Sequence, residues 1–194
     1  MHRYQYLNPK LKNMEVRILI TELQTERLIL KKMKVSDSPN LYKIWSDPDV
    51  TKFMNIDNFN DEKQAVLMIQ MLEKLSQENK AIRYSIFHRE SNQIIGSCGF
   101  NSLDFENSKA EIGYEISKIY WRNGFASEVI LKLLDYAYKS LQFYRIEAKV
   151  EPANIKSIRL LEKLNFHYEG TLRKSERAND TFIDLKLYSK LITD

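Results

Sequence analysis

A strand pattern followed directly by a small-residue loop and a long amphipathic helix is the feature that most limits how this chain can fold. Residues 110–116 alternate as a strand does, and residues 121–128 supply the loop and the start of the helix. Such a helix start presents unpaired backbone N–H groups and the positive end of the helix dipole, which together favour a phosphate group. Gly124 lets the backbone approach a ligand closely, and Ala126 adds little bulk. The segment therefore predicts a pyrophosphate-binding enzyme.

Length and composition predict one folded domain. The chain has 194 residues, of which 43% are hydrophobic and 29% charged, as in soluble globular proteins with a substantial core. We expect an N-terminal extension over residues 1–24 and a single domain over residues 25–194. The formal net charge of +4 suits an anionic cofactor or an acidic partner. It does not indicate nucleic-acid binding, because the basic residues are interspersed with 26 acids.

The single cysteine and the three histidines limit which kinds of chemistry the chain can carry out. Cys98 is alone, so no disulfide can form within the chain, and a cytoplasmic location is expected. No motif pairs Cys98 with a histidine, so a buried side chain is expected there rather than a nucleophile. The three histidines are scattered and no Cys/His spacing is typical of a metal site. No apolar run is long enough to span a membrane.

Alternation of apolar and polar residues predicts seven strands, the last two forming a hairpin that turns at Asn179-Asp180. The expected strands cover residues 27–33, 82–86, 93–103, 109–117, 144–150, 168–177 and 181–191. Apolar residues at helical spacing predict four helices between them, in the order β-αα-βββ-α-β-α-ββ. This order predicts an α/β (α+β) fold.

Capping and breaking residues mark the ends of the four expected helices. These residues are Ser36 or Ser38 before the first helix, Pro39 in its first turn, Pro48 after it, Asn60 before the second, Gly124 before the third, and Asn154 and Asn165 around the fourth. Asn165 is expected to take the left-handed conformation that ends a helix. No internal repeat or low-complexity linker divides the chain.

Three short motifs follow one another on these elements. The first is the loop Trp121-x-x-Gly124-x-Ala126; the second runs from Asn154-x-x-Ser157 to Glu162-Lys163-Leu164-Asn165-Phe166; and the third is Glu169-Gly170-x-x-Arg173. Any one of them alone is weak, but three in this order on the right elements are specific.

These motifs resemble those of the GNAT acetyltransferase superfamily, most closely its RimJ/RimL-type branch of protein N-terminal acetyltransferases. The resemblance covers about residues 25–192. Trp121 departs from the Gln or Arg that opens the superfamily's loop, although Trp is familiar in this branch, and Asn165 replaces the glycine of the second motif. The resemblance implies a GNAT fold with a mixed, mostly antiparallel sheet of about seven strands and about four helices, splayed between strands four and five.

The resemblance also implies a site for acetyl-CoA as co-substrate, without a metal. Backbone N–H groups of the loop would hold the pyrophosphate, and the residues concerned are Arg122, Asn123, Gly124, Phe125, Ala126 and Ser127. The pantetheine would lie in the splayed gap beside the backbone of Ile116 and Ser117, where an N–H near Ile116 would polarise the thioester carbonyl. Asn154 and Ser157 of the second motif complete the implied cofactor site.

Acetyl transfer to an amine needs a group that takes a proton from the alkylammonium, and a carboxylate can do so. The resemblance implies two candidates, Glu111 on strand four and Glu176 near the tip of the last hairpin, and the residues alone do not choose between them. Ser157 matches the serine that the RimL-type branch assigns to protonating the departing thiolate. Many superfamily members place a tyrosine for that purpose where this chain has Leu161.

The resemblance favours the N-terminal amine of a protein, ribosomal proteins included, as the acceptor. A small amine, such as an antibiotic or a polyamine, is the alternative within the enzyme class, because a fold does not fix its acceptor. A CoA-binding regulatory module with little catalysis is the alternative outside it, and the absent tyrosine at Leu161 favours it modestly. Trp45, Phe53 and Tyr84 are candidates for the acceptor pocket or for the core. A homodimer stays open.

Overall fold

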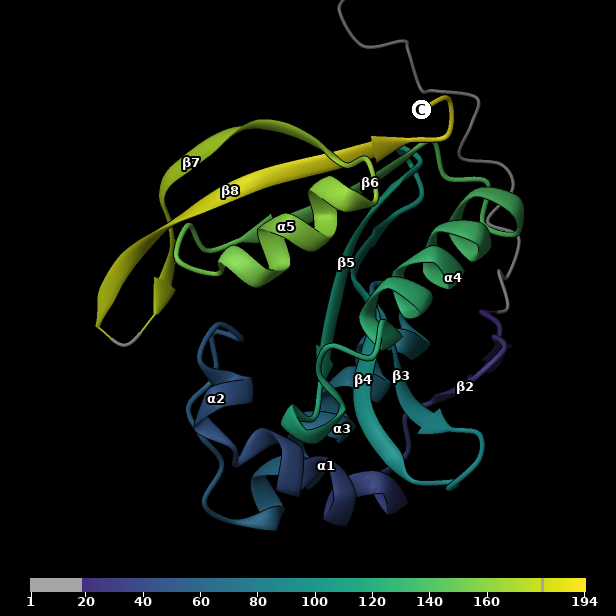
Figure 1. Ribbon diagram of the computed structural model, residues 1–194, viewed down its shortest axis with the longest axis vertical. Helices are drawn as coiled ribbons and strands as arrows, with labels where there is room; N and C mark the ends of the chain where they lie inside the picture. The colour runs from purple at the N-terminus through teal and green to yellow at the C-terminus, as the bar shows by residue number, and fades with distance from the viewer. Residues whose placement is uncertain (1–18, 179) are drawn as a thin grey trace, which may run out of the picture.

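The computed structural model describes residues 19–178 and 180–194, which build one eight-stranded sheet with helices against both of its faces (Figure 1). The strands are β1 (Glu22–Gln24), β2 (Leu28–Lys32), β3 (Ile82–His88), β4 (Ile94–Asp104), β5 (Lys109–Ile116), β6 (Arg145–Val150), β7 (His167–Ala178) and β8 (Thr181–Leu191). The α-helices are α1 (Ser38–Trp45), α2 (Pro48–Thr51), α3 (Glu62–Gln77), α4 (Phe125–Lys139) and α5 (Ile155–Lys163). Two short 3₁₀ helices, η2 (Val35–Asp37) and η3 (Lys118–Tyr120), precede α1 and the loop before α4.

The expected order of strands and helices is confirmed. The described residues contain one more strand, β1, and one more α-helix, α2, than expected. β1 is only three residues long and lies in the stretch expected as an extension, the first 18 residues of which lie outside the described part. Pro48 both follows α1 and begins α2, a four-residue helix too short to show periodicity. Residue 179 of the expected hairpin turn also lies outside the described residues.

Two of the predicted helix caps were wrong by one residue. Asp37, not Ser36 or Ser38, is the N-cap of α1, and it makes no side-chain capping bond, although Pro39 lies in the first turn as expected. Asp61 rather than Asn60 is the N-cap of α3, because its carboxylate and the side chain of Gln64 form a capping box.

The strands are ordered β1-β2-β3-β4-β5-β6-β8-β7, and every neighbouring pair is antiparallel except β5 and β6. β5 and β6 pair only over residues 109–111 and 145–147, after which the two strands separate. The rest of β5, residues 112–116, therefore has no strand beside it on its β6 side. This gap is the splay that the family resemblance implied.

Apolar side chains fill both sides of the sheet and set where each helix packs. α4 and α5 cover one face, where Leu133 and Leu161 are fully buried with Phe100 of β4 (Figure 1). On the other face, α1 and α3 enclose a second cluster that includes Leu41 and Ile69. Because α4 and α5 stand on either side of the gap on one face, the gap runs between two helix starts.

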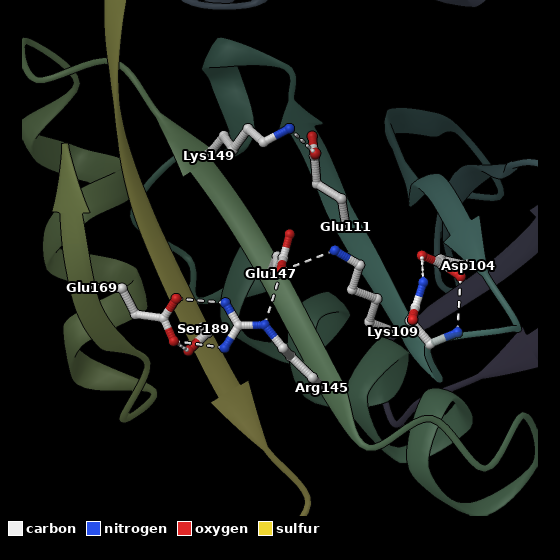
Figure 2. Close-up of polar contacts among 9 residues, drawn as sticks. Asp104, Lys109, Glu111, Arg145, Glu147, Lys149, Glu169 and Ser189 are labelled. Carbon is white, nitrogen blue, oxygen red and sulfur yellow. Dashed lines mark hydrogen bonds and ion pairs between the residues drawn. The ribbon is translucent and has the colours of Figure 1, made fainter. Parts of the chain in front are cut away.

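A ladder of charged side chains crosses the sheet where β5 and β6 are paired (Figure 2). Arg145 of β6 binds Glu169 of β7 through two hydrogen bonds, of 2.6 and 2.5 Å, and Glu147 through a third of 2.8 Å. Ser189 of β8 also donates to Glu169, at 2.7 Å. The bonds from Arg145 lower the pKa of Glu169 most, and the bond from Ser189 comes next. Together they hold that pKa at about 2, well below its ordinary value of 4.5.

We expect Glu169→Gln to destabilise the protein in a pH-dependent way. A carboxylate with a lowered folded-state pKa stabilises the fold above its unfolded pKa, near 4.5, and loses that contribution as the pH falls towards 2. The variant should lose about 0.5–1 kcal/mol at pH 7, a small value because both side chains are partly exposed. Urea unfolding at pH 7, 4 and 2.5 measures it, with the exposed Glu90→Gln as control. A loss that did not shrink between pH 4.5 and 2 would contradict the assigned role of the Arg145 pair.

Candidate active site

The loop before α4 has the geometry that the sequence predicted for an anion seat. Gly124 is the N-cap of α4 and has a left-handed backbone, with φ of 79°. Among the turn and cap hydrogen bonds of the described residues, none is donated by a backbone N–H of residues 122–127. The first such donor is Glu128, whose N–H reaches the Gly124 carbonyl at 3.1 Å. The N–H groups of the loop are therefore free to bind an anion at the positive end of α4.

A cluster from the turn between β1 and β2 supports this loop from behind. Arg27 donates to the carbonyl of Asn123 at 2.9 Å and forms an ion pair with Glu128 at 2.7 Å. Thr25 also donates to Glu128, at 2.5 Å. Partial burial raises the pKa of Glu128, but the bonds from Thr25 and Arg27 outweigh it and leave that pKa below its ordinary value. No local pattern indicates this cluster, because Arg27 and Asn123 are 96 residues apart.

The free edge of β5 presents Ile116 to the gap but not Ser117. The Ser117 N–H donates to the Ile95 carbonyl at 2.7 Å, and its own carbonyl accepts from Tyr120 at 2.9 Å. Both backbone groups of Ser117, one of the expected cofactor contacts, therefore already have partners within the protein. Backbone groups of successive strand residues point to opposite edges, so the N–H and the carbonyl of Ile116 face the gap.

Trp121, the residue that departs from the superfamily's loop motif, fastens this edge. Its indole N–H donates to the Ile116 carbonyl at 2.7 Å, and the ammonium of Lys156 lies 4.2 Å from the centre of its ring. Since Lys156 is in the first turn of α5, Trp121 connects the two sides of the gap. The Ile116 N–H is then the backbone group at this position that a ligand can use.

A cavity of about 380 Å³ lies where the gap opens, and its walls come from both faces of the sheet. Four residues predicted for the site line it together: Glu111 of β5, Glu176 of β7, the α5 cap Asn154, and Ser157. As expected, the Asn154 side chain caps α5 by accepting from the Ser157 N–H, at 3.2 Å. The fold thus brings side chains from three distant segments to one end of the gap.

The carboxylates around this cavity differ in how they are engaged. Lys149 holds Glu111 in an ion pair of 2.7 Å (Figure 2). Within the described residues, Glu176 forms no ion pair and accepts one side-chain hydrogen bond, from Asn55 at 3.1 Å. Of the two candidate carboxylates, Glu176 is therefore the one without an ion pair among the described residues.

A third carboxylate, Glu115, was not anticipated from the sequence. It is buried against Arg83, with 2.6 Å between guanidinium and carboxylate, and it accepts from the Trp45 indole at 3.0 Å. Gly113, two residues earlier on the same face, leaves room for Arg83, since a Cβ there would lie 2.8 Å from the guanidinium. This fully paired group forms part of the cavity wall and gives it a fixed shape.

Ser157 is hydrogen-bonded to a half-buried tyrosine, Tyr114. The Tyr114 hydroxyl and the Ser157 Oγ are 2.7 Å apart, and both residues line the cavity. Burial raises the pKa of Tyr114, with the Ser157 bond only partly opposing it, and either hydroxyl can be the donor between the two residues. If Tyr114 donates to Ser157, the hydroxyl hydrogen of Ser157 is free for another acceptor. No motif indicates this pair, which joins β5 to α5.

The remaining candidate residues fall into two groups, those that line the cavity and those that are buried in the core. Trp45 and Phe53 line the cavity, whereas Tyr84 is fully buried and donates to the Ile20 carbonyl at 2.8 Å. Cys98 is fully buried as expected, and burial raises the pKa of its thiol. Among the described residues, no group of three His, Cys, Asp or Glu side chains is placed to hold a metal ion. None of the helices over residues 19–178 and 180–194 has both the length and the apolarity to cross a membrane.

Comparison with known proteins gives several matches to this arrangement. A family model described as an acetyltransferase (GNAT) domain matches residues 27–167. The uncharacterized N-acetyltransferase p20 of Bacillus licheniformis is 52% identical over 169 residues, which are 87% of this chain and 95% of p20. The ribosomal-protein-serine acetyltransferase of Escherichia coli K12 is 29% identical over 118 residues, 61% of this chain and 65% of that protein.

Among solved structures, the microcin C7 self-immunity acetyltransferase MccE, in complex with acetyl-CoA and AMP, has the same fold. It matches with a TM-score of 0.80 at 25% identity and covers 92% of this chain and 100% of that one. The range matched by the family model contains the loop, β5 and α5, and ends before Glu176.

Proposed function

This chain belongs to the GNAT acetyltransferase family, and we propose that it transfers the acetyl group of acetyl-CoA directly to the N-terminal amine of a protein. The observation that carries the proposal is the cavity at the gap, where Glu176, Asn154 and Ser157 meet the free edge of β5. The ribosomal-protein-serine acetyltransferase among its relatives supports a protein acceptor. A single cysteine is consistent with a protein that works in a reducing cytoplasm. Because that cysteine is buried, it offers no accessible thiol for an acyl-cysteine route.

The residues at the gap fit acetyl-CoA in kind and in order. The free N–H groups of residues 122–127 would bind the pyrophosphate, and the unpaired edge of β5 would pair with the pantetheine as a strand would. Asn154 and Ser157 would border the pantetheine from the α5 side. When bound there, acetyl-CoA supplies the activated acetyl thioester.

Glu176 is assigned as the general base. An N-terminal amine is mostly an ammonium below its pKa, near 7.7–8.0, and has to lose a proton before it can attack. Glu176 takes that proton, the nitrogen then forms its bond to the acetyl carbon, and the carbon–sulfur bond breaks. The Ile116 N–H, at the free edge of β5, donates to the carbonyl oxygen as negative charge develops on it.

Ser157 is assigned as the hydrogen-bond donor to the departing sulfur, and Tyr114 as the residue that orients it. In this assignment the Tyr114 phenol donates to Ser157, so that the serine hydrogen is left for an acceptor in the cavity that both residues line. The second proton, which the attacking nitrogen loses as it becomes an amide, passes through Ser157 to the thiolate. This pair supplies a donor from β5 and α5, although position 161 is leucine.

We expect Tyr114→Phe to lower kcat about 3–10-fold while the KM for acetyl-CoA stays the same. One hydrogen bond is worth roughly 0.5–1.5 kcal/mol, and 1.36 kcal/mol corresponds to a factor of ten in rate. Tyr138→Phe is the matched control, since it removes another partly buried phenol that donates to a carbonyl, Lys190, at 2.9 Å. Ser157→Ala combined with Tyr114→Phe should be no slower than Ser157→Ala alone. Additive losses in the double variant would contradict the coupling.

A combined binding and turnover assay tests the proposed function. Saturating acetyl-CoA should raise the Tm, because a ligand that binds only the folded state stabilises it. Peptides with a free N-terminus should then release CoA thiol and gain an acetyl group on the α-amine. Turnover with antibiotics or polyamines but not peptides would identify a small-amine enzyme instead. A Tm shift without thiol release from any amine would identify a regulatory CoA-binding module.

A further inference from the structure

We infer that the acceptor amine sits next to an apolar side chain, so that the preferred N-termini begin with residues such as leucine or methionine. This inference rests on the proposed function and names the acceptor class of the same cavity. Its basis is the contrast between two parts of the cavity lining. One part carries carboxylates, and the other, called the wall below, consists of the apolar side chains of Met54, Ile56, Met68 and Leu72.

The apolar wall comes from α3 and from the segment between α2 and α3. Met54, Ile56, Met68 and Leu72 line the cavity, and all four are partly buried against the core cluster around Leu41 and Ile69. Leu67 and Met71 of the same helix point elsewhere, with exposed fractions of 65% and 50%. The α3 part of the wall is therefore one defined face of that helix, and an apolar group placed against the wall would leave water.

Two of the cavity carboxylates are already paired with cations, and two are not. Glu111 and Glu115 are already neutralised by Lys149 and Arg83, at 2.7 and 2.6 Å. Glu176 and Glu151 also line the cavity and form no ion pair among the described residues; burial, and then the nearby Glu176, raise the pKa of Glu151. An ammonium further along the acceptor that lay against Met54, Ile56, Met68 and Leu72 would find no carboxylate among those four side chains.

Acceptor side chains should therefore be ranked by how well they suit that wall. Leucine or methionine would bury apolar surface against Met68 and Leu72. Serine would place a hydroxyl, and lysine an ammonium, where no partner lines the wall. A pocket built for apolar groups separates such side chains by roughly 10–200-fold in kcat/KM.

The test measures kcat/KM for matched tetrapeptides that begin with Leu, Met, Ser or Lys, together with leucine amide and spermidine. We expect Leu and Met peptides to exceed Ser and Lys peptides by at least about tenfold. Leucine amide distinguishes a free small amine from a peptide that carries the same side chain. Faster acetylation of the Ser peptide or of spermidine would overturn the inference but leave the proposed transferase intact. No acetylation of any amine would instead overturn the proposed function.

A substitution in the wall locates the preference. Leu72→Asn should reduce the ratio of the Leu to the Ser peptide by about tenfold and leave the KM for acetyl-CoA unchanged. Met71→Asn, on the exposed side of the same helix turn, is the matched control and should change neither value. Should Leu72→Asn fold poorly, Met54→Asn, outside the helix, tests the same wall. An unaltered ratio in a folded wall variant would overturn the inference.

Discussion

Glu176→Gln should lower kcat/KM for the acceptor by about 10²–10³-fold and leave the affinity for acetyl-CoA unchanged. The amide keeps the size of the side chain and its contact with Asn55, but it cannot take a proton from the ammonium. The deficit should be largest near pH 7 and shrink above about pH 9, where the α-amine is already neutral. Initial rates of thiol release from pH 6.5 to 9.5 measure both effects.

Glu111→Gln is the matched control for this prediction. Glu111 also lines the cavity, but it is already in an ion pair with Lys149. The substitution should therefore lower kcat/KM by less than about tenfold. Part of that cost should appear as lower stability, because the Lys149 ammonium loses its partner. Equal losses in the two variants, or less than tenfold in Glu176→Gln, would contradict Glu176 as the base.

Gly124→Val should weaken acetyl-CoA binding by about 100-fold or more. The left-handed backbone, with φ of 79°, disfavours every side chain, and a β-branched one most. A relaxed loop would turn its N–H groups away from the phosphate, and the branched side chain would stand where the ligand approaches. Isothermal titration with acetyl-CoA measures the loss of affinity.

Gly124→Ala separates the two causes of this effect. Its Cβ would meet only the Arg27 guanidinium, at an ordinary 3.5 Å, so any loss comes from the backbone conformation alone. We expect it to bind about tenfold less tightly than the natural protein, since αL strain costs roughly 1–2 kcal/mol. Unchanged affinity in Gly124→Val would contradict the loop as the pyrophosphate seat.

Features encoded locally were the ones that the sequence predicted well. The loop at Gly124, the Asn154 cap and the left-handed Asn165 each depend on a few neighbouring residues, and the structure has all three. Errors of one residue occurred where two caps competed, as at Asn60 and Asp61. β1 and α2 were missed because three or four residues carry no measurable period.

Contacts between distant segments were beyond sequence reasoning. Arg27 behind the loop, and Arg83 against Glu115, join strands and turns that only the fold brings together. The choice between Glu111 and Glu176 likewise depended on Lys149, which no motif connects with either. The backbone partners of Ser117 show the same limit, because the edge to which a strand N–H points depends on the register with β4.

The central claim is that acetyl-CoA and an amine meet in the cavity at the gap between β5 and β6. A crystal structure with a bisubstrate conjugate, CoA joined through an acetyl bridge to a leucine-initiated peptide, tests it most directly. We predict the pyrophosphate on the N–H groups of residues 122–127 and the peptide nitrogen beside Glu176, with the leucine side chain against Leu72. A conjugate whose pyrophosphate lies away from that loop, or whose peptide leaves the cavity on the side away from Glu176, would contradict the account.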